Sequence, residues 1–172
     1  GFAMAMTALD YEAIRQLLAR YSVALDLADR ATFETCFASD AYFAESGLPG
    51  EPAARFEGRQ AIGEFAARFF PIAAGQIRHW SSPPLIDGDG LHAVGTSFLM
   101  VLRTGTAPGT GVILTGIYRD RYTKIDDRWY FAARDFSVDP HTTSTDPFVD
   151  RFDQFVAGRP EQQPFDQRTT SA

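Results

Sequence analysis

The hydrophobic pattern of this chain changes from mainly helical to mainly strand-like spacing between residues 71 and 76, and that change limits the folds open to it. Before this point, apolar side chains recur every three or four residues, as on one face of a helix. After it, apolar and polar side chains alternate, as in strands that bury one face. Helices followed by strands and turns are typical of an α+β domain, in which the helices pack on one face of an antiparallel sheet.

The first helix is predicted over about residues 8–27. Thr7 and Asp10 have the spacing of a capping box, and the apolar residues that follow keep helical spacing. Asp26 belongs to the row of side chains that adjoins this apolar stripe. We therefore expect Asp26 at the edge of the buried face.

Two further helices are predicted before the change of period. A short one covers residues 30–38, where Phe33 and Phe37 are four apart and so share a face. Another covers residues 59–71, with phenylalanines at helical spacing, and Pro71 is expected to end it because proline does not fit a helix interior.

Strands and turns make up the rest of the predicted domain. Strands are predicted for residues 40–46, 76–82, 91–105, 111–125 and 128–138. Turns rich in Gly, Pro and Asp are predicted for residues 87–90, 106–111 and 126–127, and a loop for residues 47–58. The last strands, joined by short turns, are expected to pair as hairpins.

The length of the chain predicts one domain, which we place at residues 8–138. Residues 1–7 resemble a vector scar before a native start. Residues 139–172 form a predicted C-terminal extension. An apolar stripe within it fits a short helix that covers the sheet or a neighbouring subunit, and residues 159–172 are expected to be disordered.

The charge balance excludes two classes of partner. The formal net charge is −6, whereas nucleic acid and anionic membrane surfaces call for clustered Lys and Arg.

No apolar run is long enough for a signal peptide or a membrane span. The single cysteine, Cys36, can form no internal disulfide, which fits a reducing compartment. A cytoplasmic protein is therefore expected.

Several familiar chemistries lack their motifs. The three histidines, His79, His92 and His141, are not paired at metal-ligand spacing, so no metal site is expected. The segment "GTAPGTG" opens no helix and has no following Lys-Ser/Thr, so it reads as a hairpin turn and not a phosphate-binding loop. No G-x-S-x-G nucleophile motif is present. We expect no cofactor.

Acid–base chemistry remains open, with His79 as the candidate base. On the sequence alone, His79 fits an ordinary core or surface histidine as well as it fits a catalytic one. Asp26 lies near a helix C-terminus, where a negative charge is unfavourable and so invites an explanation. An imidazole partner would supply one, because the carboxylate would accept the Nδ1–H, fix the tautomer and raise the basicity of Nε2.

Two more residues could join such a site. Arg134 is mid-strand, either paired on the sheet or aimed into a pocket, and Asp135 points to the opposite face. By strand alternation, Ala132, Arg134 and Phe136 are expected on one face. Tyr21 lies on the buried stripe of the first helix, where a phenol needs a partner unless it is an ordinary core residue.

Four segments, in this order and spacing, resemble the SnoaL-like branch of the nuclear transport factor 2-like superfamily: "LLARYSVALDLADRATFETCFASDAYF", "FEGRQAIGEF", "IRHWSSPPLIDGDG" and "GIYRDRYTKIDDRWYFAAR". The resemblance covers about residues 8–138. It implies a cone: a curved antiparallel sheet wrapped around N-terminal helices, with one deep apolar pocket. Members include polyketide cyclases, steroid isomerases, scytalone dehydratase, bile-acid 7α-dehydratase and hexachlorocyclohexane dehydrochlorinase.

The lyases of this superfamily use an Asp–His dyad without metal or organic cofactor, and the resemblance places that dyad on Asp26 and His79. Bile-acid dehydratases also use a tyrosine five residues before the aspartate and an arginine on a late strand, which match Tyr21 and Arg134. The chain departs from some dehydratases in the segment "TSFLMVLRTG", which has no acidic residue in its middle.

The expected function is that of a cofactor-independent lyase or isomerase. His79 would take a proton from carbon, Asp26 would orient the His79 ring, and Tyr21 and Arg134 would stabilise the oxygen that gains charge.

The predicted substrate-binding residues are Phe33, Phe43, Phe69, Met100, Tyr118 and Phe136. The alternatives are a polyketide-type cyclase and a non-catalytic binding or assembly module, since the superfamily contains both. The expected partners are a steroid- or polyketide-like ligand and further copies, as a homodimer or homotrimer.

Overall fold

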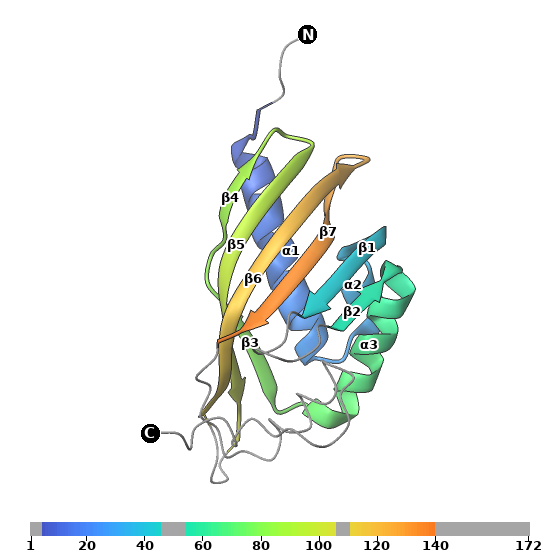
Figure 1. Ribbon diagram of the computed structural model, residues 1–172, viewed down its shortest axis with the longest axis vertical. Helices are drawn as coiled ribbons and strands as arrows, with labels where there is room; N and C mark the ends of the chain where they lie inside the picture. Colours follow the sequence, from blue (N-terminus) through green and yellow to red (C-terminus); the bar gives the residue numbers. More distant parts are fainter. Residues whose placement is uncertain (1–4, 46–53, 106–110, 140–172) are drawn as a thin grey trace.

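The computed structural model describes residues 5–45, 54–105 and 111–139 (Figure 1). Residues 1–4 of the predicted start and residues 140–172 of the predicted extension therefore lie outside the described residues. The elements are α1 Ala8–Asp26, α2 Arg30–Glu34, β1 Phe37–Glu45, β2 Ala54–Glu57, α3 Gly58–Ala73, β3 Ile77–Ser81, β4 Leu85–Gly88, β5 His92–Arg103, β6 Gly111–Ile125 and β7 Arg128–Val138.

The strands form one curved, open sheet in the order β2-β1-β7-β6-β5-β3, with β4 paired to β5. In the view of Figure 1, α1 runs behind the long strands, and α3 lies beside β1 and β2. The predicted α+β class is confirmed. One pairing differs from a purely antiparallel sheet, because β1 and β7 run parallel.

The first helix begins and ends where the sequence predicts, within one residue. Thr7 Oγ1 accepts the Asp10 backbone N–H at 3.2 Å, and Asp10 Oδ2 accepts the Thr7 N–H at 2.9 Å, so the predicted capping box is present. The helix ends at Asp26, which is only 8% exposed. The predicted position of Asp26, at the edge of the buried face, is confirmed.

Two predictions between residues 30 and 58 were wrong. The helix predicted over residues 30–38 ends at Glu34, because the chain turns into β1 at Phe37. Part of the predicted loop 47–58 is the strand β2, which pairs with β1. The loop prediction followed the Pro and Gly residues of this segment and missed the short alternating run after them.

Pro71 does not end α3, which continues to Ala73. The helix ends where the backbone turns left-handed, at Ala74 with φ 48° and Gly75 with φ 71°. Pro71 donates no N–H to the carbonyl of Ala67, but the helix continues for two residues until this left-handed turn ends it.

The C-terminal strands match their predictions closely, and β6 and β7 have the predicted bounds. Asp126 and Asp127, with φ of 50° and 61°, make the predicted tight turn between them. The predicted turn at 87–90 is partly wrong, because residues up to Gly88 belong to β4.

The register of β6 and β7 slips by one residue at Ala132. Arg134 and Phe136 are buried, as predicted for one face, but Ala132 lies across the slip and lines a hollow that the two others do not. The prediction that all three share a face was therefore wrong. A β-bulge reverses the alternation of side chains beyond it, and nothing in the local sequence marks this one.

Aromatic rings fill the space between the sheet and the helices. Phe37, Phe131 and Tyr21 form one group, with the centroids of Phe37 and Phe131 5.3 Å apart. Phe43 and Phe65 form another, with centroids 5.1 Å apart. Most of the phenylalanines in the described ranges thus build the core.

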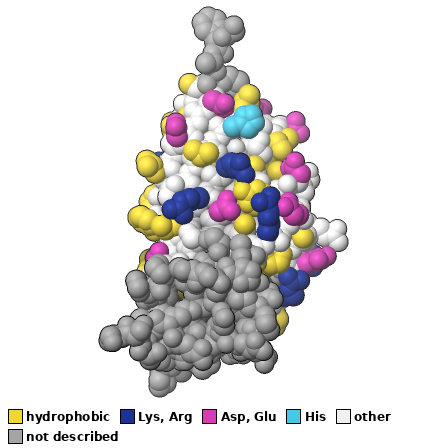
Figure 2. Space-filling model, viewed as in Figure 1, with side chains coloured by type: hydrophobic (Ala, Val, Ile, Leu, Met, Phe, Trp, Pro, Cys, Tyr) yellow, Lys and Arg dark blue, Asp and Glu magenta, His cyan; other side chains and the backbone are white. Residues whose placement is uncertain are grey.

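The outer face of the sheet mixes charged and apolar side chains (Figure 2). Trp80 is 62% exposed and Phe98 65%, and both line one hollow with Met100. None of the described helices is both long and apolar enough to cross a membrane.

Asp10 links the start of α1 to the β6–β7 hairpin. Besides Thr7, its carboxylate accepts Trp129 Nε1–H at 2.9 Å and Lys124 Nζ–H at 3.0 Å. These hydrogen bonds, first that of the Thr7 backbone amide, hold the pKa of Asp10 well below its ordinary value.

We predict that Asp10→Asn lowers the free energy of unfolding at pH 7 by about 1.5–3 kcal/mol, the usual range for hydrogen bonds to a charged group. Because the pKa is depressed in the folded state, this stabilisation is present above about pH 4 and is lost as the pH falls towards the folded-state pKa. The difference in free energy of unfolding between wild type and Asp10→Asn should therefore shrink in acid. Urea unfolding followed by circular dichroism, at pH 7 and at lower pH, measures it. Glu12→Gln, an exposed change on the same helix, is the control, and equal stabilities of wild type and Asp10→Asn at pH 7 would refute the role of Asp10.

Candidate active site

The last residue of α1 and the middle of β3 meet through two hydrogen bonds. Asp26 Oδ2 accepts the backbone N–H of His79 at 2.6 Å, and Asp26 Oδ1 lies 2.6 Å from His79 Nδ1. Both residues are 8% exposed. One carboxylate thus fixes both the strand and the ring of His79.

This contact decides which ring nitrogen of His79 is available. An ionised carboxylate can only accept hydrogen bonds, so Nδ1 carries the hydrogen, and Nε2 is left with a lone pair when the ring is neutral. Phe69 packs against the ring at a centroid distance of 5.7 Å and an interplanar angle of 65°. The ring is therefore held in one orientation by a carboxylate and an aromatic neighbour.

His79 lines a small apolar cavity between the sheet and the helices. The lining comes from α1, α3 and five strands: Tyr21, Leu25, Phe43, Phe65, Phe69, His79, Leu99, Tyr118 and Phe136. The cavity has a volume of about 20 Å³, room for about one water molecule. Among the described residues this cavity is smaller than the expected deep pocket, and His79 also lines a hollow of about 390 Å³, open to solvent, between α1 and the segment that follows β3.

Four of the six predicted substrate-binding residues line this cavity: Phe43, Phe69, Tyr118 and Phe136. Phe33 does not. It is fully buried in the core, where its ring centroid lies 5.1 Å from that of Tyr21. Met100 does not either, because in β5 it alternates with buried Leu99 and Val101 and lines a hollow with exposed Trp80.

Tyr21, the third predicted catalytic residue, is 1% exposed and lines the cavity with His79. Burial raises the pKa of Tyr21, while the charge of Arg134 and a hydrogen bond from Tyr118 act in the opposite direction. Its phenol is therefore neutral at physiological pH and can donate a hydrogen bond.

Arg134, the fourth, points inward but does not line the cavity. It forms a two-pronged ion pair with Asp120, from Nε to Oδ1 at 2.9 Å and from Nη2 to Oδ2 at 3.1 Å. Of the two alternatives for Arg134, the structure shows pairing on the sheet. The sequence analysis did not identify Asp120 as the partner. If the pairing of β6 and β7 next to their turn continued without the slip at Ala132, Arg134 would lie opposite Arg119 instead of Asp120.

The guanidinium of Arg134 lies among aromatic rings. Its Cζ is 3.5 Å from the ring centroid of Tyr118, 4.3 Å from that of Tyr21 and 4.5 Å from that of Phe131. Burial disfavours its charge, but Asp120 and the neighbouring phenols together hold the pKa of Arg134 above its ordinary value. Arg134 thus remains a cation inside the core.

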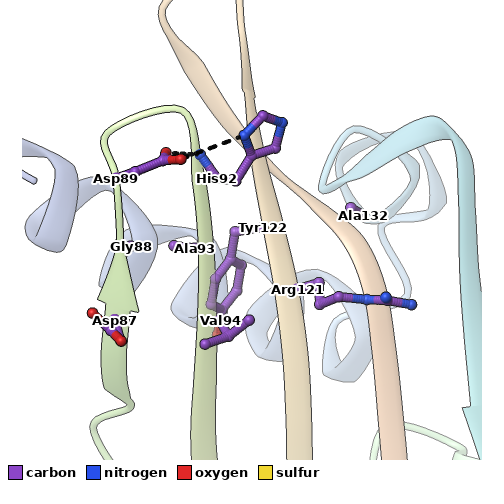
Figure 3. Close-up of a pocket in the computed structure, with 9 residues that line it drawn as sticks. All are labelled: Asp87, Gly88, Asp89, His92, Ala93, Val94, Arg121, Tyr122 and Ala132. Carbon is purple, nitrogen blue, oxygen red and sulfur yellow. Dashed lines mark hydrogen bonds and ion pairs between the residues drawn. The ribbon is translucent and has the colours of Figure 1, made fainter. Parts of the chain in front are cut away.

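A larger hollow lies elsewhere on the sheet (Figure 3). It measures about 630 Å³, is open to solvent and is lined by none of the predicted site residues. His92 lies there beside Asp89, with Nδ1 3.9 Å from Oδ2, and is exposed, as expected next to a turn. No group of three His, Cys, Asp or Glu side chains suited to a metal ion occurs within the described ranges.

Comparisons with known proteins agree with this architecture. The sequence matches the family model of the SnoaL-like domain over residues 6–135. No curated protein matches it. A solved protein of unknown function with a cystatin-like fold, from Nostoc punctiforme, is 27% identical with a TM-score of 0.70, and the alignment covers 80% of this chain and 97% of that one.

Two other solved structures, both from Novosphingobium aromaticivorans, share the fold at lower identity. One, assigned as a scytalone dehydratase, is 23% identical with a TM-score of 0.60, over 76% of this chain and 85% of that one. The other, assigned as the β subunit of an aromatic-ring-hydroxylating dioxygenase, is 18% identical with a TM-score of 0.65, over 80% of this chain and 94% of that one.

The dyad geometry makes a prediction that needs no substrate. Neutral His79 should carry its hydrogen on Nδ1, and Asp26→Ala should release the ring to the more common Nε2–H tautomer. Proton–nitrogen correlation spectra of imidazole-labelled protein distinguish the two forms. An Nε2–H tautomer in the folded wild type would contradict the hydrogen bond to Asp26.

Proposed function

The chain belongs to the SnoaL-like domain family, and on this premise we propose that it is a cofactor-independent lyase or isomerase acting on a hydrophobic, cyclic small molecule. The observation that carries the proposal is the 2.6 Å contact between Asp26 Oδ1 and His79 Nδ1, at the wall of an apolar cavity. A carboxylate–imidazole pair in such surroundings is suited to act as a general base.

In the proposed reaction, Nε2 of His79 takes a proton from a carbon next to a carbonyl group. The electron pair of the broken C–H bond forms a carbon–carbon double bond while the π pair of the carbonyl moves to its oxygen, and the imidazolium that forms is stabilised by Asp26. Loss of water or another β-leaving group then completes a lyase reaction. Reprotonation at another carbon gives an isomerase, and attack on an internal electrophile gives a cyclase.

Tyr21 is proposed to hydrogen-bond the oxygen that gains charge, because its ring lines the same cavity as His79. Arg134 is proposed to act on that oxygen from behind Tyr21, since its two prongs are taken by Asp120 and its Cζ lies 4.3 Å from the Tyr21 ring. A cation at this place favours negative charge in a dry interior.

The proposed ligand is steroid- or polyketide-like, because the cavity wall is mostly aromatic. A cavity of about 20 Å³ does not hold such a molecule, so binding must displace side chains of the wall. Phe43, Phe65, Phe69 and Phe136 are the phenylalanines of that wall.

A cytoplasmic location is part of the proposal and is supported by Cys36. This cysteine is buried and unpaired, which fits a reducing compartment. Burial raises the pKa of its thiol to about 11, so the sulfur is protonated at neutral pH and is not a candidate nucleophile.

We predict that His79→Ala and Asp26→Ala each lower turnover by at least about a hundredfold, the usual scale for loss of a general base. The assay is a screen of hydroxylated steroids and polyketide intermediates for loss of water, read by mass spectrometry. His92→Ala, which removes an exposed histidine, should leave the rate unchanged. Wild-type rates in both dyad variants would exclude this mechanism.

A second candidate is a non-catalytic assembly module of the same fold. It is supported by the small cavity, by the likeness to a dioxygenase β subunit, and by the exposed side chains of Trp80 and Phe98 on the sheet. In either case, we propose that this face joins copies of the chain into a homodimer or homotrimer.

The combined variant Trp80→Glu/Phe98→Glu should lower the mass of the particle in solution to that of one chain, because two charges would be buried at the contact. Light scattering after gel filtration measures this. Leu9→Glu, at an 81% exposed apolar position near the start of α1, is the control and should not change the mass. A wild type that is already monomeric at tens of micromolar would contradict the assembly proposal.

A further inference from the structure

The ion pair between Asp120 and Arg134 is the most deeply buried charged contact among the described residues, and both side chains are 0% exposed. Removing two charges from water is costly, and apolar replacements of such pairs are often no less stable. Stability alone is therefore a weak explanation for this pair.

The geometry of Asp120 fixes the orientation of the guanidinium. Its two oxygens take Arg134 Nε and Nη2, and Oδ2 also accepts the Tyr122 hydroxyl at 3.0 Å. Three donors thus hold one carboxylate, and one edge of the guanidinium is fully occupied. A planar group held along an edge cannot rotate.

The face of the guanidinium meets two phenols that line the cavity. Its Cζ lies 3.5 Å from the ring centroid of Tyr118 and 4.3 Å from that of Tyr21. Tyr118 and Tyr21 line the cavity with His79, whereas Asp120 and Arg134 do not. Any influence of Asp120 on a ligand must therefore pass through Arg134 and these two rings.

The two phenols are also joined to each other. Their ring centroids lie 6.2 Å apart at an interplanar angle of 80°, an edge-to-face contact, so a change in the position of one ring affects the other. Burial raises the pKa of both phenols, the charge of Arg134 opposes this, and the charge of Asp120 adds to it.

We propose that Asp120 is a positioning residue: it holds Arg134 in one orientation against Tyr118 and Tyr21, and so fixes the two phenol groups that share the cavity with His79. The inference rests on the proposed function, in which Tyr21 hydrogen-bonds the oxygen of the ligand. Asp120 touches no ligand in this account. It acts by placing the cation that supports the phenols.

The test needs no substrate. Wild type and Asp120→Asn are labelled with ¹³C at the Cζ of tyrosine, and their NMR signals are followed from pH 7 upwards, with assignment by Tyr21→Phe and Tyr118→Phe. Asparagine keeps the shape of Asp120 but leaves the Arg134 charge uncompensated. The Tyr21 and Tyr118 signals should move at pH 7, and at least one phenol should ionise at a lower pH than in wild type.

Asp10→Asn is the matched control, because Asp10 is also a buried carboxylate that accepts several hydrogen bonds. It lies in the first turn of α1, whereas Tyr21 lies near the end of that helix. It should leave the Tyr21 and Tyr118 signals unchanged. Identical Tyr21 and Tyr118 signals in wild type and folded Asp120→Asn, throughout the titration, would overturn the proposal.

If Asp120→Asn does not fold, the double variant Asp120→Leu/Arg134→Met removes both charges together and is expected to fold. Without the Arg134 cation, the Tyr21 and Tyr118 signals should move at pH 7, and neither phenol should ionise earlier than in wild type. Wild-type signals for both tyrosines in the folded double variant would equally overturn the proposal.

With a substrate in hand, Asp120→Asn should lower kcat roughly tenfold to a hundredfold with a smaller change in KM, the effect of a misplaced catalytic group. The two proposals then fail separately. If wild type has no activity but Asp120→Asn shifts the Tyr21 and Tyr118 signals, only the catalytic function is rejected. If wild type is active but Asp120→Asn leaves both signals unchanged, only the role of Asp120 is rejected.

Discussion

The contact between Asp26 and His79 joins parts of the chain that are 53 residues apart. The same carboxylate binds the backbone of β3 and the imidazole ring, so the position of the edge strand and the state of the histidine depend on one side chain. The helix α1, capped at its start by Thr7, carries that carboxylate on its last residue. Fold and candidate chemistry are thus linked through one helix.

The interior contains more charge than its apolar wall suggests. Arg134 and Asp120 form one buried ion pair, next to the rings of Tyr21 and Tyr118, and Asp26 and His79 form another. Aromatic rings surround the guanidinium of Arg134, whereas His79 also lines a hollow of about 390 Å³ that is open to solvent. A ligand would have to displace those rings, and the buried charges would then act on it without competition from water.

The sequence was informative where a pattern is local. The capping box at Thr7, the stripe that includes Tyr21 and the turn at Asp126 each follow from residues close in the chain, and the family resemblance brought His79 to Asp26. It was uninformative where the outcome depends on pairing between strands. The slip at Ala132 reversed the face of that residue and brought Arg134 opposite Asp120, and neither follows from alternation. Asp120 still had a signal: it alternates with Tyr118 and Tyr122 on one strand, which placed a charged residue among inward-facing aromatics.

Exchange of carbon-bound hydrogen for deuterium tests the central claim most directly, because it follows proton removal whatever product forms later. Cyclic ketones and hydroxyketones that bind the protein are incubated with it in D₂O and weighed by mass spectrometry. The account predicts that wild type, but not His79→Ala, introduces deuterium next to the carbonyl of at least one of them. Exchange no faster than in buffer alone, for every compound that binds, would contradict the account.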